Sequence, residues 1–480
     1  MTSTNKMSNY RWVICAMLFL ATTINYMDRQ VLSLTWADFI KPEFQWNDDD
    51  YGTITSFFSI FYAVISLFAG KFIDWMGTRK GYIWAIVVWS LGACLHAGCG
   101  WVAVRAEGLS SVDEFMLMDK AAQISLMGLT LSVWLFIACR MILAVGEAGN
   151  FPAAIKVTAE FFPKKDRALA TSIFNSGASI GALVAPLTIP VLAKQWGWEM
   201  SFVIIGALGF VWAGLWLFAY DKPTDCRFMN ETELAYINSD DGAAPVSDEE
   251  DKTFVAGDFS IIDCFMYRQT WAFIVGKLLT DGVWWFFLFW APAYFKELGF
   301  PVTTFTGQML IFVLYLIVTI VSIFGGYLPK YFVEQKGMEP YAGRMRAMLI
   351  FAFLPIFAMF AQPLASYSVW LPCVIIGLAG AGHQAWSANL YSTIGDMFPK
   401  RAIATITGIG TLFGGLCSFA INKCSGMLFT YAESLGADFS FFGVVGKPAG
   451  YMMIFCYCAV AYLVAWFIMK ALVPKYKPIE

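Results

Sequence analysis

Long apolar stretches alternate with short polar segments over most of the 480 residues. An apolar run of about 20 residues can cross the hydrocarbon core of a bilayer as an α-helix. Twelve runs approach that length, near residues 12–36, 51–73, 81–101, 128–150, 168–192, 199–220, 271–295, 304–328, 346–362, 370–392, 403–424 and 449–472. A membrane β-barrel would instead show short segments of alternating hydrophobicity. The pattern therefore predicts an all-α polytopic membrane protein with 12 transmembrane helices.

The composition agrees with this interpretation. Of all residues, 59% are hydrophobic and 14% are charged, whereas soluble domains average about 45–50% and about 25%. The formal net charge of −3 argues against a nucleic-acid-binding surface, so no nucleic acid is expected as a partner. Most of the eleven cysteines lie within apolar runs and there are only two histidines. These residues predict buried thiols, with neither a disulfide framework nor a metal site.

Lysine and arginine concentrate in alternate loops. Arg79 and Lys80 lie between the second and third runs, and Lys164 and Lys165 lie between the fourth and fifth. The intervening loops are richer in acids, as at residues 48–50. Because loops rich in lysine and arginine stay in the cytoplasm, both termini are expected there, as an even number of helices also requires.

Two polar segments interrupt the pattern of runs. Residues 222–268, with an acidic stretch at 247–251, separate the first six runs from the last six. We therefore expect an N-terminal six-helix bundle at 1–221, a cytoplasmic linker at 222–268 and a C-terminal bundle at 269–480. A solvated spacer is the favoured interpretation of the linker, and regulation or partner docking is the alternative. Residues 102–126 predict an extracytoplasmic insertion with a short surface helix.

A repeat relates the two halves of the chain. The sequence FPKK at 162–165 precedes the fifth run, and FPKR at 398–401 precedes the eleventh. Six runs separate the two copies, so the halves are expected to cross the membrane in the same direction. Two parallel six-helix halves with a substrate site between them are the architecture of the major facilitator fold.

Six charged residues fall deep inside the apolar runs. Each costs about 2.5–3.5 kcal/mol at the centre of a bilayer, so they must pair or face a watery cavity. Glu147 follows Arg140 by seven positions, about 10 Å along one helix face, which is too far for a direct pair. Lys277 and Asp281 are four positions apart and can touch, whereas neighbouring residues of one helix point in different directions and need partners elsewhere. The full set is Asp28, Arg29, Arg140, Glu147, Lys277 and Asp281.

An anionic substrate would give these charges a function. Arg29 or Arg140 can hold a carboxylate through two parallel hydrogen bonds. Glu147 or Asp28 can take up a proton and thereby offset the negative charge of the substrate during its crossing. The alternative is that the charged groups only hold helices together, an alternative given most weight for the pair on the seventh run.

A polar and aromatic set near the middle of the runs suits a hydroxylated ligand. His383 could relay protons or make an interhelical hydrogen bond. A structural role in the core or against lipid is the commoner one for any single aromatic residue. The candidate ligand residues, besides Arg29, Lys277 and Asp281, are Tyr26, Tyr62, Asn150, Asn175, Trp284, Trp285, Gln384, Trp386, Ser387 and Asn389.

The loop between the second and third runs contains two glycines, an acid and two bases. Glycine allows a tight turn, and Asp74 could contact a helix N-terminus or a base of the other half and so latch the cytoplasmic side. A charged membrane anchor is the alternative. The candidate gating residues are Gly70, Asp74, Gly77, Arg79 and Lys80.

This loop resembles the signature of the major facilitator superfamily. Three segments resemble its anion:cation symporter family more specifically: NYMDR at 25–29, RMILAVGEAGNFP at 140–152 and FNSG at 174–177. Within that family, residues 277–292 and 383–401 are most similar to hexuronate transporters. The resemblance covers nearly the whole chain apart from 102–126 and the linker.

The resemblance implies proton-coupled import of sugar acids across a bacterial inner membrane. It implies that Arg29 and Tyr62 contact the substrate carboxylate and that Asp28 and Glu147 carry protons. Arg140 would then set the charge balance of Glu147.

Together, these observations predict a secondary active transporter for hexuronates such as glucuronate or galacturonate, working by proton symport and alternating access. It is expected to be a monomer without enzymatic activity, metal or cofactor, with the proton as coupling ion. One alternative is a symporter for another organic anion, such as galactonate, glucarate or an aromatic acid. A transporter-like nutrient sensor and a membrane enzyme are less favoured alternatives.

Overall fold

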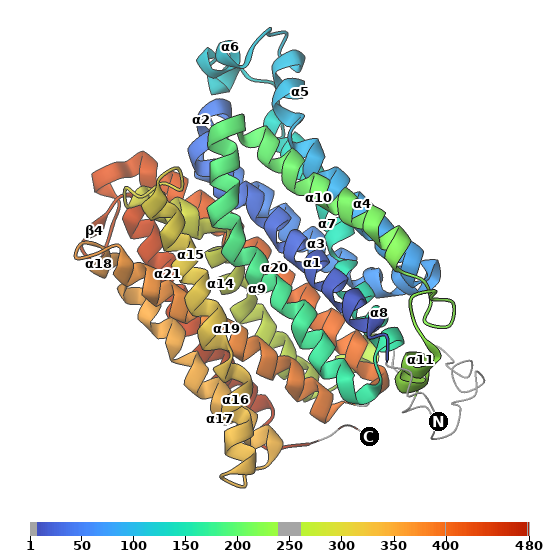
Figure 1. The fold of residues 1–480 in the computed structure, drawn as a ribbon. Helices are drawn as coiled ribbons and strands as arrows, with labels where there is room; N and C mark the ends of the chain where they lie inside the picture. The colour runs from blue at the N-terminus through green and yellow to red at the C-terminus, as the bar shows by residue number, and fades with distance from the viewer. Residues whose placement is uncertain (1–6, 239–260, 399, 478, 480) are drawn as a thin grey trace.

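The computed structural model describes residues 7–238, 261–398, 400–477 and 479, so the acidic stretch at 247–251 lies outside the described residues. The described part is largely helical. Figure 1 shows the N-terminal half (blue to green) beside the C-terminal half (yellow to red), with both chain termini at one end of the bundle and α2, α5 and α6 toward the other.

The N-terminal half contains six helical segments of spanning length. The fourth is divided at Gly149 into α7 and α8, and the third bends by 48° between α4 and α5. The segments are α1 (Tyr10–Thr35), α3 (Asp48–Met76), α4 with α5 (Thr78–His96 and Cys99–Ala106), α7 with α8 (Leu131–Glu147 and Asn150–Phe161), α9 (Lys164–Trp196) and α10 (Trp198–Ala219).

The C-terminal half repeats this arrangement with six further segments. They are α14 (Arg268–Glu297), α15 with α16 (Phe305–Ser322 and Phe324–Glu334), α17 with η4 and α18 (Pro340–Ala352, Leu354–Phe360 and Ala361–Ala365), α19 (Trp370–Met397), α20 (Lys400–Leu435) and α21 (Lys447–Leu472).

Short elements connect these segments. They are η1 (Trp36–Ile40), α2 (Lys41–Phe44), α6 (Val112–Leu117), η2 (Lys120–Ala122), the hairpin of β1 and β2 (Ser125–Leu126 and Leu129–Thr130), α11 (Glu231–Ile237), α13 (Ile261–Cys264), η5 (Gly436–Asp438) and the hairpin of β3 and β4 (Ser440–Phe441 and Val444–Val445).

Among the described residues, nine helices are long and apolar enough to cross a membrane by composition alone, and α4 with α5 makes a tenth. The two remaining segments of the predicted twelve are α1 and α19. These two helices contain buried polar side chains, including Asp28 and Arg29 on α1 and His383 on α19. Several of these buried polar residues are among those proposed from the sequence for function.

The two halves meet mainly along two helix pairs, α3 with α20 and α9 with α15. Glycine allows the first pair to approach closely, since a Cβ on Gly52 would lie 2.7 Å from the carbonyl oxygen of Asn422 and 2.9 Å from the Cα of Gly426. Only glycine permits this separation, because a real Cβ does not approach backbone atoms so closely.

The end of the bundle opposite the termini is closed by ion pairs between the halves. Three acids of the N-terminal half face three lysines of the C-terminal half. The pairs are Asp38–Lys296 at 3.0 Å, Asp48–Lys447 at 2.6 Å and Asp49–Lys423 at 2.5 Å. The hydroxyl of Tyr51 also donates to the carbonyl of Phe289 at 2.8 Å.

The local sequence explains why acids occur at this end of α3. Asn47 accepts a hydrogen bond from the backbone N–H of Asp50, and the Asp50 side chain accepts one from the Asn47 N–H. Such a capping box satisfies the free N–H groups at a helix start, where negative charge is also favourable. The helix start thus holds Asp48 and Asp49 in position for the opposite half.

The insertion at 102–126 packs onto this closed end. Phe115 of α6 contacts the ring of Phe44, and the Gln45 side chain donates to the carbonyls of Met116 and Met118 at 2.7 Å. α6 is the short helix expected there, although the third span extends to Ala106 before the insertion begins.

Candidate functional site

Arg29, in the last third of α1, forms a buried ion pair with Glu147, the last residue of α7. Arg29 donates from Nε at 2.9 Å and from Nη2 at 2.7 Å, and both bonds end on Oε2 of Glu147. Arg29 is 4% exposed and Glu147 is fully buried. The second carboxylate oxygen, Oε1, has no hydrogen-bond partner among the described residues. The pair is therefore neutral overall but keeps one acceptor unused.

Aromatic rings surround the guanidinium of Arg29. Its Cζ lies 4.8 Å from the ring centre of Tyr62, 5.2 Å from Tyr26, 5.9 Å from Phe58 and 5.1 Å from Trp285. Cations over aromatic faces are stabilised by the ring quadrupole. Trp285 lies on α14 and the other rings lie on α1 and α3, so both halves of the chain contribute to this site.

Arg140 and Asp28 extend the charged cluster behind this pair. Arg140 donates from Nη2 to the backbone carbonyl of Arg29 at 3.3 Å, and it lies close enough to Asp28 to interact electrostatically. Neither carboxylate oxygen of Asp28, nor Nε or Nη1 of Arg140, has a hydrogen-bond partner in the described chain. Unpartnered buried polar atoms are rare in folded proteins and call for water, protons or a ligand.

A second charged pair lies on the C-terminal half. Lys277 contacts Asp281 one turn later at 2.6 Å, as the spacing predicted, and donates to the Tyr391 hydroxyl at 3.0 Å. Oδ1 of Asp281 has no partner among the described residues. A Cβ on Gly414 would collide with this carboxylate, so glycine at that position lets α20 pass beside it.

His383 belongs to a buried aromatic group beside Lys277. Its Nδ1 shares a hydrogen bond of 2.8 Å with the Tyr462 hydroxyl, and its ring stacks on Trp284 at 5.6 Å. Trp386 is fully buried and meets the ring of Tyr462 edge-on. This arrangement fits interhelical packing, the alternative noted above for His383.

Two asparagines expected at the ligand site instead join helices. Asn150 is fully buried and accepts a hydrogen bond from the Tyr82 hydroxyl at 2.8 Å. Asn389 donates to the carbonyls of Gly325 and Ala385, both at 2.8 Å. Gln384 is half-buried and Asn175 is exposed.

Two residues of the site were not among the sequence candidates. Phe58 lies one turn before Tyr62 on α3 and contacts both Arg29 and Arg140. Tyr391 lies two turns after Gln384 on α19 and holds Lys277. Helical spacing from the candidates could have indicated both, since residues four and seven positions apart share a helix face.

The loop expected between the second and third runs is reduced to Gly77, and its other candidate residues lie at the ends of α3 and α4, where they contact the N-terminal half. Asp74 pairs with Lys156 of α8 at 2.7 Å, and Arg79 pairs with Asp221 at 2.8 Å. Gly77 has a φ of 78°, which a residue with a side chain rarely adopts. Among the described residues, Asp74 therefore contacts its own half, while Gly70 and Lys80 face outward.

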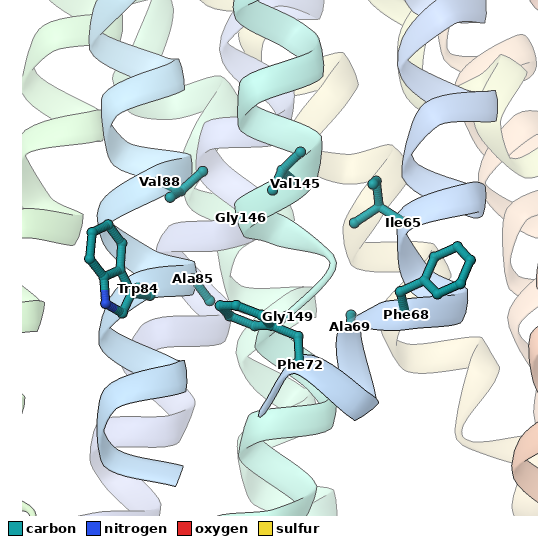
Figure 2. A pocket seen from close by; sticks show the side chains of 10 residues that line it. All are labelled: Ile65, Phe68, Ala69, Phe72, Trp84, Ala85, Val88, Val145, Gly146 and Gly149. Atoms are coloured by element: carbon teal, nitrogen blue, oxygen red, sulfur yellow. The ribbon is translucent and has the colours of Figure 1, made fainter. Parts of the chain in front are cut away.

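An apolar groove lies on the N-terminal half beside the break between α7 and α8. Figure 2 shows it between α3, α4 and α7, lined by aromatic, aliphatic and glycine residues. A sugar acid needs charged or hydrogen-bonding partners, which this lining lacks. The buried ion pairs around Arg29 and Lys277, with carboxylate oxygens that have no partner among the described residues, form the candidate ligand site.

Comparison with known proteins extends the assignment. Residues 18–422 match the sequence profile of the Major Facilitator Superfamily. The chain is 27% identical to the hexuronate transporter of Escherichia coli K12, over 90% of each chain. It is 26% identical to a probable galactarate/D-glucarate transporter of the same strain, over 93% of this chain and 94% of the relative.

Solved structures show the same fold at lower identity. The crystal structure of a D-xylose–proton symporter superposes with a TM-score of 0.66 at 15% identity, covering 98% of this chain and all of the symporter. A bacterial homologue of the human lysosomal transporter Spinster, in an inward-facing conformation, gives a TM-score of 0.64 at 18% identity over 96% and 97% of the two chains.

Proposed function

Because the chain belongs to the Major Facilitator Superfamily, and is thus a multi-pass membrane transporter and not an enzyme, we propose that it imports sugar acids of the hexuronate type by proton symport. Relatives along nearly the whole chain are named as hexuronate and galactarate/D-glucarate transporters, which supports a sugar acid as substrate.

The observation that carries the proposal is the Arg29–Glu147 pair. Both Arg29 bonds end on one Glu147 oxygen, so a substrate carboxylate must compete with Glu147 for the same donors. A protonated Glu147 loses its negative charge and holds the guanidinium only weakly. One proton on Glu147 therefore frees Arg29 for one substrate carboxylate, and the total charge of the site stays unchanged.

The aromatic residues around Arg29 provide the rest of a sugar-acid site. Tyr26 and Tyr62 supply hydroxyls, and the indole face of Trp285 suits the C–H face of a sugar. Because Trp285 belongs to the C-terminal half and Arg29 to the N-terminal half, substrate bound here contacts both halves. Such contacts link binding to the rocking of one half against the other.

The closed end supplies the barrier that alternating access requires. We place this end on the extracytoplasmic side of a bacterial inner membrane, with both termini in the cytoplasm, following the distribution of lysine and arginine. Outward opening then requires separation of the pairs Asp38–Lys296, Asp48–Lys447 and Asp49–Lys423.

A second substrate class is favoured by Lys277. Its buried ammonium gives the C-terminal half a cation of its own, which suits the second carboxylate of a dicarboxylic sugar acid such as galactarate. The candidate proton carriers in this half are Asp281, which pairs with Lys277, and His383, which lies beside Lys277 without pairing with it.

Uptake into proteoliposomes tests the proposal. The purified chain is reconstituted, an inward proton gradient is imposed, and radiolabelled glucuronate, galacturonate and galactarate are compared. Accumulation above the outside concentration that collapses with a protonophore supports sugar-acid symport. Gradient-independent equilibration of all three acids would contradict proton coupling.

A further inference from the structure

The apolar groove of Figure 2 lies on the outer surface of the N-terminal half. It has a volume of about 230 Å3, larger than the engineered apolar cavity of about 150 Å3 that stays dry and binds benzene. Phe68 of α3 and Trp84 of α4 flank it and are 59% and 53% exposed. Since these helices belong to spanning segments, the groove opens toward the lipid.

The floor of the groove is helix backbone. A Cβ on Gly146 would lie 2.7 Å from the Cα of Trp89, and a Cβ on Gly149 would lie 2.8 Å from the Cβ of Ala85. Larger residues at either glycine would push α7 away from α4. The two glycines therefore allow the fourth span to pack closely against α4.

Two lysines lie close to lining residues along the chain, near the ends of α3 and α4 that meet at Gly77. Lys71 precedes Phe72, a lining residue of α3, and Lys80 lies one turn before Trp84 on α4. Both lysines are exposed and make no ion pair with a described residue. Trp75, 80% exposed on α3, is of the type that marks a membrane–water boundary.

The groove also touches the break in the fourth span. Gly146 and Gly149 line it on either side of Glu147, the residue that holds Arg29. The group that fills the groove thus contacts the backbone that positions this carboxylate.

We propose that the groove binds one acyl chain of an anionic phospholipid, whose headgroup is held by Lys71 and Lys80. The lining contributes an apolar channel and the lysines contribute charge complementarity, since basic residues at a membrane surface attract anionic lipids. The bound chain supports the α7–α8 break and keeps Glu147 directed at Arg29. The lipid site is argued from the groove and the two lysines. Only the effect of the bound lipid on Glu147 rests on the proposed function.

Photo-crosslinking tests the site directly. The full-length chain is placed in phosphatidylcholine nanodiscs with a trace of phosphatidylglycerol that carries a diazirine in one acyl chain, and labelled peptides are mapped by mass spectrometry. We expect labelling concentrated at 65–72 and 84–88. Labelling spread evenly over the lipid-facing surfaces of α3, α4 and α10 would overturn the proposal.

Filling the groove supplies the matched comparison. Ala69→Phe occupies it from α3, and Leu91→Phe places the same phenyl ring at an exposed α4 position outside it. Ala69→Phe should reduce labelling about tenfold, the effect of losing the burial of two methylenes at about 0.8 kcal/mol each, whereas Leu91→Phe should leave it unchanged. Should Ala69→Phe fail to fold, Val145→Phe at the 42% exposed rim replaces it. Equal labelling of the filled and wild-type grooves would contradict the site.

A double variant, tested with two lipid probes, separates the contribution of the lipid headgroup from that of the acyl chain. Lys71→Gln with Lys80→Gln should abolish the preference for phosphatidylglycerol over a phosphatidylcholine probe while retaining labelling by both. An unchanged preference would show that the lysines do not hold the headgroup. Labelling is measured without substrate or gradient, so its outcome is independent of sugar-acid transport.

Discussion

Arg29 donates two hydrogen bonds, of 2.9 Å and 2.7 Å, to a single carboxylate oxygen of Glu147, a residue 118 positions later in the chain. Both side chains are buried, and four aromatic rings from the two halves enclose the guanidinium. Breaking such a pair by deleting one partner is costly, because a buried charge then lacks compensation. When a substrate carboxylate replaces that of Glu147 on Arg29, and Glu147 takes up a proton, no buried charge is left without compensation.

Glu147→Gln should uncouple transport from the proton gradient. Glutamine imitates the protonated acid, so Arg29 remains available to substrate, but no proton is carried. We expect gradient-driven accumulation to fall at least about tenfold, because the proton gradient no longer drives transport. Exchange of labelled for unlabelled substrate should continue, because the binding site is retained. Proteoliposome uptake and counterflow measure the two. Loss of both activities would show that Glu147 is needed for binding itself.

Arg29→Lys should weaken substrate binding about tenfold or more. Lysine retains the charge but lacks the planar fork that bonds a carboxylate with two parallel donors. Isothermal titration with glucuronate measures the change, and Arg79→Lys, at an exposed pair in the first turn of α4, is the control. Equal affinity of Arg29→Lys and the wild type would place the carboxylate elsewhere.

Lys277→Gln should have different effects on the binding of sugar acids with one carboxylate and of those with two. If Lys277 binds the second carboxylate of a dicarboxylic sugar acid, its loss weakens galactarate competition by about tenfold, the scale of a hydrogen bond to a charged group. Glucuronate, with one carboxylate on Arg29, should be little affected. The double variant Lys277→Gln with Asp281→Asn removes the pair without leaving a buried charge. Equal losses for both acids would indicate a structural pair.

Lys447→Gln should destabilise the closed end. Asp48 is fully buried, and among the described cations it keeps Lys41 at 3.4 Å once Lys447 is lost. We therefore expect the free energy of unfolding to fall by about 3 kcal/mol, the lower end of the range for a broken buried pair. Lys330→Gln removes an exposed pair with Glu334 and should change stability by less than about 1 kcal/mol. Thermal unfolding in detergent compares the two variants. Similar shifts in melting temperature would contradict the assignment of Asp48–Lys447 as a buried ion pair that holds this end closed.

The stability of the fold should fall as pH rises from about 4.5 to about 7 because of Glu43 on α2. Burial between α2, α5 and α10 raises the pKa of Glu43 to about 7, although Trp198 donates a hydrogen bond to it at 2.6 Å. A raised carboxyl pKa favours the folded state at low pH, and this advantage is lost between about 4.5 and about 7. Its full size is on the order of 3 kcal/mol. Glu43→Gln should flatten the melting temperature across that range, and an unchanged slope would refute the assignment.

The sequence predicts the architecture well because bilayer thickness imposes helix length. Spacing along one helix was also informative, since it paired Lys277 with Asp281 four positions away. The partner of Arg29 was not predictable in this way, because Glu147 lies on another helix and its approach depends on how α1 and α7 cross. Asn150 and Asn389 show the same limit. An asparagine in an apolar run has the same sequence pattern whether it meets a ligand or a neighbouring helix.

Proton uptake on substrate binding tests the central claim most directly. Calorimetric titration of glucuronate into the purified chain, in buffers of different ionisation enthalpy near neutral pH, counts the protons taken up with each substrate. Competition between the substrate carboxylate and Glu147 for Arg29 predicts uptake of about one proton by the wild type and none by Glu147→Gln. Binding without proton uptake, or equal uptake by both proteins, would contradict the account.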